Sequence, residues 1–444
     1  MNGIPPDLKP PSPGTVDILM TIHPAAPTEG RPCASLTALL TRYRRAARRL
    51  ALLTLMGVAT VFAVGCGEHA APAPSTNAPL AAPVAPVLTA SFKPNTGLIV
   101  PVSIAGKGYH FIVDTGASFS AIDSQLGASL TRAPSDAQVP VIFQKMLAQG
   151  FTTPNGTLTR ADLPLWQSLP LQLGNHTLAA SLPWLGLDLS LTSQAAGQKI
   201  DGIIGMDIVR QFTWVVDNRT GQVTVWRDRP SSEHFSHCVP YEDSFGKSPG
   251  ISVEFGENWV NFRMDTGARY SIANAPLLKH LAEHKAVTTL GGATPSATVN
   301  GLAQSRDHML TGFSFDGHAL GRLHVSEGTD NFLGLNFFAR LDRYMIVPST
   351  MEFCYEASRF TQDEPVPLRN IPIRFINGHV ELFGDASNEL ARYGLQHGDV
   401  LLDINGQRIA PAAIADAREQ LATTPAGTLN LTIERAGARR DIHL

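Results

Sequence analysis

The sequence has little of what a nucleic-acid-binding or nucleotide-dependent protein needs. No run of lysine or arginine lies beyond residue 49, so a basic stripe for phosphates is missing and nucleic acid is not expected as a partner. No G-x-S-x-G, P-loop or dinucleotide-binding fingerprint occurs. Charged residues are only 16% of the chain and apolar residues are 43%, as in globular proteins rather than disordered ones. The length of 444 residues favours about three domains.

Long apolar runs are also scarce, and the clearest one lies near the N-terminus. Arginines between residues 42 and 49 precede the run Leu50–Val64, which is the order of a secretory signal peptide. The Ala-Val-Gly-Cys that ends at Cys66 is similar to a bacterial lipobox, in which the cysteine is lipidated and becomes the new N-terminus. Residues 42–66 therefore predict a signal peptide with a lipobox. The alternative is an uncleaved signal anchor, since a run of about 15 apolar residues is just long enough to span a bilayer.

The segments on either side of the signal lack the apolar residues of a core. Residues 1–41 are rich in proline and are interpreted as a disordered extension or an upstream start artefact. Residues 67–94 are an Ala/Pro-rich linker. Lipidation would hold the protein in the cell envelope, facing the periplasm. The outer membrane is favoured because Gly67, not an aspartate, follows Cys66, and membrane attachment by a single-pass signal anchor is the alternative.

Cysteine is scarce, with four in the whole chain. Cys33 would be lost on processing and Cys66 would carry the lipid. The remaining two, Cys238 and Cys354, would lie in an oxidising compartment, where a disulfide is reasonable. Each of them closes one half of an internal repeat, so a bond between them would tie the ends of the two halves together. Two unpaired buried thiols are the alternative.

Beyond the linker, short apolar segments alternate with glycine, asparagine and aspartate, which is typical of strands and turns. The sequence predicts strands at 98–104, 109–113, 214–216 and 222–226. Helical stretches are few, and residues 276–285 are the clearest. The expected fold class is therefore mainly β.

Three pairs of similar segments occur in the same order, which indicates an internal duplication. In the first pair Phe, Asp, Thr, Gly, Ala and Ser agree in place. The matched segments are 111–120 with 262–271, 171–178 with 313–320, and 201–212 with 330–341. These matches predict two similar lobes, at residues 95–235 and 236–356.

Each copy of the repeat carries one Asp-Thr-Gly after an apolar strand, with Asp114 in the first copy and Asp265 in the second. The strand fixes the carboxylate, the threonine hydroxyl can lock the loop, and the glycine lets backbone N–H groups approach. Two carboxylates at about 3 Å cannot both ionise, so one keeps a proton and the other acts as a base. The pair predicts peptide hydrolysis by an activated water, with no metal, cofactor or covalent intermediate.

Both halves resemble retropepsin-like aspartic proteases, in which Asp-Thr-Gly-Ala is accompanied by an apolar-apolar-Gly element. Residues 203–205, Ile-Ile-Gly, and residues 332–334, Phe-Leu-Gly, match that element. The resemblance implies a bilobal, pepsin-like double-ψ β-barrel fold, with two threonines that interlock across the lobe interface. The supporting residues that it implies are Thr115, Gly116, Gly205, Thr266, Gly267 and Gly334. Because one chain carries both aspartates, a monomer that acts on polypeptide substrates is expected.

The two halves also differ. Retropepsin-like enzymes close a flap over the substrate, and the Gly-bearing candidates are residues 145–157 and 288–301. The first half is longer, so an insertion is expected around residues 163–191, either as ordinary core or as the lining of a groove. Arg269 stands where the first half has Ser118, which leaves open unequal roles for the two aspartates or a salt link to a nearby acid.

Residues 365–444 resemble the PDZ domains of bacterial proteases. The glycine-containing turns that carry this resemblance are Gly394-Leu395, Gly398-Asp399 and Ile404-Asn405-Gly406, with a helix expected at 412–421 and a strand at 429–434. Such domains bind extended peptides, often C-termini, by adding a strand to a sheet edge. A Gly-Φ-Gly-Φ loop is missing near residues 371–380, so a packing module without a peptide ligand is the alternative.

Two histidine clusters offer competing sites. His280 and His284 fit H-x-x-E-H, a metallopeptidase pattern, but they fall on an expected helix and are interpreted as a solvated face. His234 and His237 lie in the connector between the repeats. No metal site is predicted, and a zinc peptidase is the third hypothesis.

The function that the sequence favours is an envelope-tethered aspartic endopeptidase with PDZ-assisted substrate or partner binding. The alternative is a catalytically inactive duplicated lobe plus PDZ domain that acts as a peptide-binding envelope lipoprotein.

Overall fold

The computed structural model describes residues 18–19, 23–24, 85–94, 96–153, 156–180, 182–299, 301–384 and 388–444. The predicted signal peptide with Cys66 and the predicted linker up to residue 84 lie outside the described residues. Within the extension 1–41, two short strands are described, β1 (Ile18–Leu19) and β2 (His23–Pro24). No helix of the described part is long and apolar enough to cross a membrane.

The fold is mainly β, as the sequence predicts. In the first lobe, the predicted strands at 98–104 and 109–113 form a hairpin with Leu98 paired to Val113. Its tight turn at Ala105 and Gly106 has positive φ at both residues, which suits the right-handed twist of a two-residue hairpin. The strands of this lobe are β4 (Leu98–Ile104), β5 (Lys107–Val113), β6 (Ala121–Asp123), β7 (Phe151–Thr153), β8 (Gly156–Leu158), β9 (Leu165–Trp166), β10 (Leu171–Leu173), β11 (His176–Leu178), β12 (Trp184–Leu187) and β13 (Gly202–Ile204).

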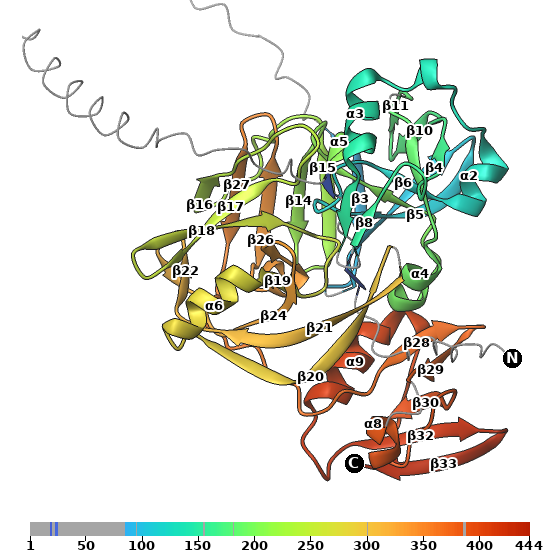
Figure 1. Ribbon diagram of the computed structural model, residues 1–444, viewed down its shortest axis with the longest axis vertical. Coiled ribbons are helices and arrows are strands. Elements are labelled where there is room, and N and C mark those ends of the chain that lie inside the picture. The colour runs from blue at the N-terminus through green and yellow to red at the C-terminus, as the bar shows by residue number, and fades with distance from the viewer. Residues whose placement is uncertain are drawn as a thin grey trace, which may run out of the picture. The chain divides into compact units, whose positions relative to one another are not determined.

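Helices of the first lobe are short and join these strands (Figure 1). They are α2 (Ser124–Leu130), the 3₁₀ turn η1 (Asp136–Gln138), α3 (Val141–Gln149), α4 (Ser190–Ala196) and α5 (Met206–Val209). Residues 163–191, where an insertion is expected, form β9 to β12, with β11 and β10 at one edge of the eight-stranded sheet and β12 and β9 at the other. Trp184 is buried there and Trp166 packs on the glycines at 127 and 186, so these tryptophans are core of the enlarged lobe.

The second lobe is built on a ten-stranded sheet whose order is β1-β20-β21-β24-β19-β25-β18-β17-β22-β23. Its strands are β17 (Gly250–Phe255), β18 (Asn258–Met264), β19 (Ser271–Asn274), β20 (Val287–Thr298), β21 (Gly301–Leu310), β22 (Phe313–Phe315), β23 (His318–Ala319), β24 (Leu323–Gly328) and β25 (Phe332–Leu333). Its helices are α6 (Ala275–Glu283), which begins one residue before the predicted helix, and α7 (Leu335–Phe338).

The same strand pairing recurs in both lobes. In the first, β13 lies between β5, to which it is parallel, and β6, to which it is antiparallel. In the second, β25 lies between β18 and β19 with the same two orientations. Each Ile-Ile-Gly or Phe-Leu-Gly element is therefore threaded between the strand that enters an Asp-Thr-Gly loop and the strand that leaves it.

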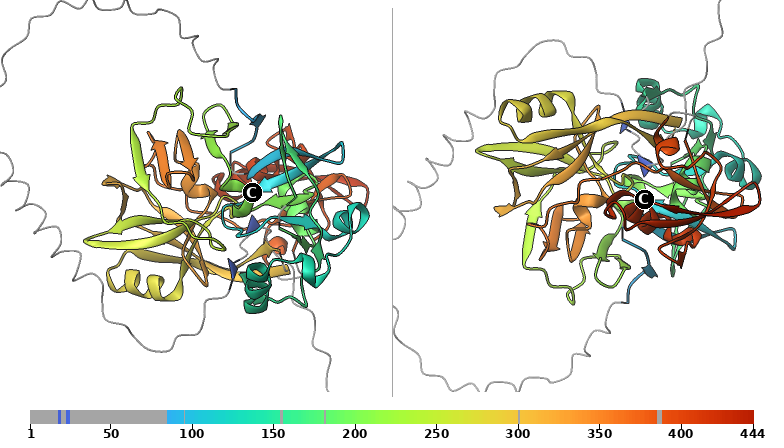
Figure 2. Two further views of the ribbon diagram at one scale, coloured as in Figure 1. Left: turned by 90° about the horizontal axis from the view of Figure 1, so that it is seen from above. Right: turned by 90° about the horizontal axis from the view of Figure 1, so that it is seen from below.

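A six-stranded sheet of order β16-β27-β26-β14-β15-β3 joins the lobes. Green strands of the first half lie beside orange strands of the second, and β14 pairs antiparallel with β26 (Figures 1 and 2). Cys238 and Cys354 face each other on β16 and β27 and form a disulfide. The strands are β3 (Leu88–Ser91), β14 (Thr213–Asp217), β15 (Gln222–Trp226), β16 (His237–Pro240), β26 (Arg343–Val347) and β27 (Glu352–Glu356).

The C-terminal part has a hydrophobic cluster of its own, from Ile371 to Ile433. Its strands are β28 (Ile373–Ile376), β29 (His379–Leu382), β30 (Val400–Ile404), β31 (Gln407–Arg408), β32 (Asn430–Arg435) and β33 (Ala438–His443). Its helices are α8 (Asn388–Arg392), η2 (Pro411–Ala413) and α9 (Ile414–Thr423). Helix α4 of the first lobe lies against β28 and α9.

Candidate active site

Asp114 and Asp265 occupy equivalent places at the ends of two strands. Asp114 follows β5 and its N–H donates to Ile204 O at 2.9 Å, whereas Asp265 follows β18 and its N–H donates to Leu333 O at 2.9 Å. Both side chains have an exposed fraction of 0%. The threaded strand behind each loop therefore fixes the backbone from which each carboxylate projects.

Each carboxylate is held by two N–H groups of its own loop. Gly116 and Ala117 donate to Asp114 Oδ1 at 2.7 and 3.1 Å. Gly267 and Ala268 donate to Asp265 Oδ1 at 2.9 Å each. Such bonds favour the ionised form of a carboxyl. Asp114 Oδ2 is buried, and no N–H group of the described residues donates to it.

The glycines of the two loops show how close the carboxyl groups lie. A Cβ built on Gly116 would stand 2.5 Å from Asp265 Cγ, and one built on Gly267 would stand 2.4 Å from Asp114 Cγ. Each loop backbone is thus seated directly against the opposite carboxyl group. Glycine is required at both places because no side chain fits between them.

Beneath the carboxylates, the two threonines interlock across the lobe interface. Thr115 N–H donates to Thr266 Oγ1, and Thr266 N–H donates to Thr115 Oγ1, both at 3.1 Å. Each hydroxyl also donates across the interface, Thr115 to Met264 O at 2.9 Å and Thr266 to Val113 O at 2.8 Å. Four reciprocal bonds lock the two loops into one unit.

The surroundings of the pair raise the pKa of Asp114 well above its ordinary value. Burial is the largest cause, because it removes the water that would solvate the charge. Repulsion by the Asp265 carboxylate and a side-chain hydrogen bond to that residue raise the pKa further. The N–H groups of Gly116 and Ala117 act in the opposite direction. The pair therefore retains a proton that an isolated aspartate would release.

A second layer of hydrogen bonds supports the Asp114 loop, and sequence reasoning missed it. Asp207 Oδ1 accepts from the N–H and the hydroxyl of Ser120, both at 2.8 Å. Ser120 Oγ in turn accepts from Gly205 N–H at 3.0 Å. Burial raises the pKa of Asp207 to about 6, although the bonds from Ser120 oppose this.

The second lobe has the same layer with an amide in place of the carboxylate. Asn336 Oδ1 accepts from Ser271 N–H and hydroxyl at 2.8 and 2.9 Å, and Ser271 Oγ accepts from Gly334 N–H at 3.0 Å. The sequence repeat contained a pattern that could have predicted this layer, because serine and Asp/Asn stand at matching places in both copies.

Ser118 and Arg269, the asymmetric pair, have different surroundings. The Ser118 hydroxyl donates to Gly246 O at 2.9 Å, on the segment that follows the first lobe. The Arg269 guanidinium lies 5.1 Å from the ring centre of Tyr270. The two loops therefore agree in their carboxylate contacts and differ in the residue that follows the alanine.

The carboxylates are covered in this structure. The candidate flap at 288–301 is most of the long hairpin of β20 and β21, and Val299 at its turn is buried. Val299 belongs to the same hydrophobic cluster as Ala117 and Phe119 of the first lobe. The other candidate, 145–157, spans the end of α3, β7 and the start of β8. The turn of the second-lobe hairpin therefore belongs to the hydrophobic cluster that includes residues of the Asp114 loop.

The histidines of the competing pattern lie on α6, away from these loops in the sequence. The rings of His280 and His284 are 4.6 Å apart and both pack edge-on against Phe255. In the described part of the chain, no group of three or more His, Cys, Asp or Glu side chains is arranged to hold a metal ion.

Comparison with known families agrees with the geometry of the first loop. Residues 100–208 match the family model of aspartyl protease. The matched aspartyl protease region runs from within β4 to within α5, so it contains Asp114, Ser120, Gly205 and Asp207. No curated protein matches the chain significantly.

Proposed function

We propose that the protein is an aspartic peptidase whose two catalytic carboxylates, Asp114 and Asp265, come from two lobes of one chain. The observation that carries the proposal is the mutual seating of the two Asp-Thr-Gly loops, each glycine against the opposite carboxyl group. The family match of residues 100–208 supports peptide hydrolysis as the reaction class.

The chemistry follows from one proton shared by two carboxyl groups. The raised pKa of Asp114 keeps that proton on the pair in the free enzyme. The ionised carboxylate removes a proton from a water between the two groups, and the water oxygen attacks the carbonyl carbon of the peptide bond. The protonated carboxyl hydrogen-bonds the carbonyl oxygen as it becomes negative. Proton transfer to the nitrogen then lets the C–N bond break and regenerates the pair.

An extended polypeptide fits the strand edges of the β20–β21 and β7–β8 hairpins. β1 pairs in parallel with the end of β20, and β2 pairs antiparallel with β7. Both edges therefore accept added strands from elsewhere in the chain. A substrate strand would bind by the same backbone hydrogen bonds, after the β20–β21 hairpin has moved away from the first lobe.

The test is cleavage of an unfolded protein at a series of pH values by the wild type, Asp114→Asn and Asp265→Asn. Each substitution removes one carboxylate of the pair, so kcat/KM is expected to fall at least about 10³-fold. Asp228→Asn, which changes an exposed aspartate, is the matched control and should be fully active. The wild type should show an acid-leaning, bell-shaped profile, whose upper limb lies above the ordinary aspartate pKa.

Cleavage that survives in both aspartate variants would refute the proposal. Activity that is lost with a chelator would instead favour a metal at His280 and His284. A wild type that binds peptides and cleaves none would favour the inactive, peptide-binding alternative.

We also propose that residues 365–444 form a PDZ-type module, whose groove lies between β28 and α9. β28 is at the edge of its sheet as described, which is where such modules add a peptide strand. Arg418 of α9 donates to Ile373 O of β28 at 3.0 Å and to Ala195 O of α4 at 2.8 Å. A peptide ligand at this edge would therefore compete with α4 of the first lobe. Attachment to the envelope through Cys66 is proposed on the sequence alone.

A further inference from the structure

Each lobe anchors the chain segment that follows it through one arginine. Arg210, at the end of α5, donates to Asp243 at 2.6 and 2.8 Å and to the carbonyl oxygens of Ser244 and Lys247 at 3.0 and 2.6 Å. The segment 243–247 is thereby held on the first lobe, where Gly246 O accepts the Ser118 hydroxyl.

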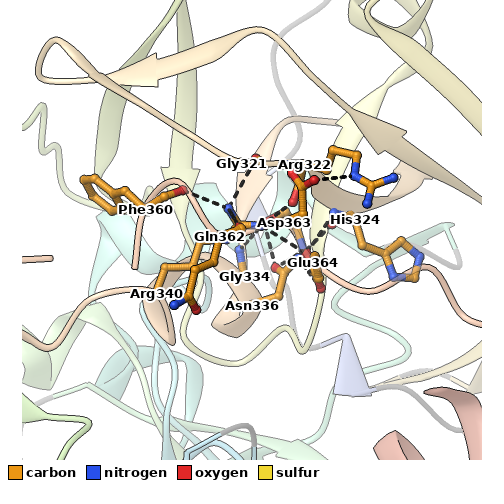
Figure 3. Close-up of polar contacts among 11 residues, drawn as sticks. Gly321, Arg322, His324, Gly334, Asn336, Arg340, Phe360, Gln362, Asp363 and Glu364 are labelled. Carbon is orange, nitrogen blue, oxygen red and sulfur yellow. Dashed lines mark hydrogen bonds and ion pairs between the residues drawn. The ribbon is translucent and has the colours of Figure 1, made fainter. Parts of the chain in front are cut away.

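Arg340 is the counterpart in the second lobe and lies just after α7. Its Nη1 donates to the carbonyl oxygens of Gly321, Phe360 and Gln362 at 3.2 to 3.4 Å, and its Nη2 lies 3.5 Å from Glu364 Oε2 (Figure 3). Only 8% of the Arg340 side chain and 16% of the Glu364 side chain are exposed. Residues 360–364 are thus held on the second lobe, beyond its predicted end at residue 356.

Glu364 also reaches the support of the second catalytic loop. It accepts from Asn336 Nδ2, at 3.0 Å to Oε2 and 3.3 Å to Oε1, and from His324 N–H at 2.8 Å. Figure 3 shows Asn336 and Glu364 turned toward one another. Because Asn336 Oδ1 accepts two bonds from Ser271, a continuous chain of hydrogen bonds runs from Glu364 to the residue six positions after Asp265.

The two lobes place a carboxylate in this layer by different routes. The first lobe carries it within the repeat, as Asp207, which bonds Ser120 directly. The second lobe has Asn336 there, and an amide can turn over and present its NH₂ to the donors of Ser271. Asn336 Nδ2 donates to His324 O at 2.8 Å and to the Glu364 carboxylate at 3.0 and 3.3 Å, and these bonds together select the orientation in which Oδ1 faces Ser271.

We propose that Glu364 is a positioning residue for the Asp265 loop. Together with the carbonyl oxygen of His324 it holds the amide of Asn336, and it supplies from outside the repeat the carboxylate that the first lobe carries at Asp207. Its effect on catalysis rests on the peptidase function proposed above, whereas its effect on the loop does not. The second lobe therefore has its full set of supporting hydrogen bonds only when the chain up to Glu364 is packed on it.

The experiment compares Glu364→Ala, Glu364→Gln and Asp363→Asn in the full chain. Asp363 is the matched control, because it is adjacent and bonds Arg322 but not Asn336. Glu364→Ala is expected to lower kcat about tenfold, equivalent to about 1.4 kcal/mol, with KM within about twofold of the wild type. Glu364→Gln keeps an oxygen acceptor for Asn336 and should recover most of kcat, and Asp363→Asn should match the wild type.

Two further measurements separate positioning from general destabilisation. In an Asn336→Ala background, Glu364→Ala should lower kcat by less than about twofold, since both residues act through one chain of bonds. Amide hydrogen exchange of a peptide that contains Ser271 should be faster in Glu364→Ala and unchanged in Asp363→Asn.

The proposal is overturned if Glu364→Ala and Asp363→Asn are alike in both kcat and exchange, or if the Glu364 and Asn336 effects on kcat are additive. If the wild type cleaves no peptide, the proposed function fails and exchange at Ser271 alone decides the positioning role.

Discussion

Gly116→Ala should inactivate the protein with little effect on the rest of the fold. Its Cβ would stand 2.5 Å from Asp265 Cγ and 2.6 Å from both carboxylate oxygens. Carbon atoms in contact need about 3.5 Å, so roughly 1 Å of separation must be created between one loop and the opposite carboxyl. Neither side can yield freely, because Gly267 and Ala268 hold the Asp265 carboxylate and the threonine interlock holds both loops.

The size of the effect follows from that displacement. A shift of about 1 Å in a catalytic group can lower the rate about 100-fold. Overpacking by one methyl costs about 1–3 kcal/mol of unfolding free energy. We therefore expect kcat/KM to fall at least about 100-fold while the protein stays folded, because the substitution spreads the two carboxyl groups apart rather than opening the core.

The assay is kcat/KM on an unfolded protein substrate at the pH optimum, with thermal unfolding measured on the same samples. Gly108→Ala is the matched control: it lies on β5, six residues before Asp114, and a Cβ there meets no atom within 4 Å. It should leave both quantities unchanged. A Gly116→Ala protein with kcat/KM within about twofold of the wild type would refute the close seating of the two loops.

Two other substitutions test the support of the pair. Thr115→Val leaves one buried N–H and one buried carbonyl without partners, so urea unfolding should show a loss of about 2–5 kcal/mol that Thr115→Ser does not show; equal stability of the two variants would contradict the interlock. Asp207 has a pKa raised from 3.8 to about 6 in the folded state, so its contribution to stability is present below about pH 4 and is lost as pH rises through 6. Asp207→Asn should remove this fall, of about 1–3 kcal/mol after allowance for partial exposure, from unfolding free energies measured between pH 4 and 7; parallel pH curves for variant and wild type would argue against it.

The strands that flank the Asp-Thr-Gly loops could be predicted because their signals are local. The short apolar segments at 98–104 and before Asp114 specify β4 and β5 without reference to the rest of the chain. The matched segments of the repeat likewise place Gly205 and Gly334 behind their loops, since both copies fold by the same local rules.

The roles of Glu364 and Arg340 could not be read in this way. Glu364 lies outside the matched segments, and its partner Asn336 is 28 positions away. No periodicity or motif marks a carboxylate that accepts hydrogen bonds from a distant side-chain amide. The same holds for α4, whose contact with β28 and α9 depends on how distant surfaces meet.

The sequence by itself determined that two Asp-Thr-Gly loops exist, that each follows a buried strand, and that each has an apolar-apolar-Gly element to support it. Only the tertiary structure decided that the loops, 151 residues apart, exchange hydrogen bonds through Thr115 and Thr266 and that Val299 of the β20–β21 hairpin joins the hydrophobic cluster of Ala117. The physical reason is that loop formation depends on neighbouring residues, whereas the approach of two carboxylates depends on the pairing of β14 with β26 and on the packing of whole lobes.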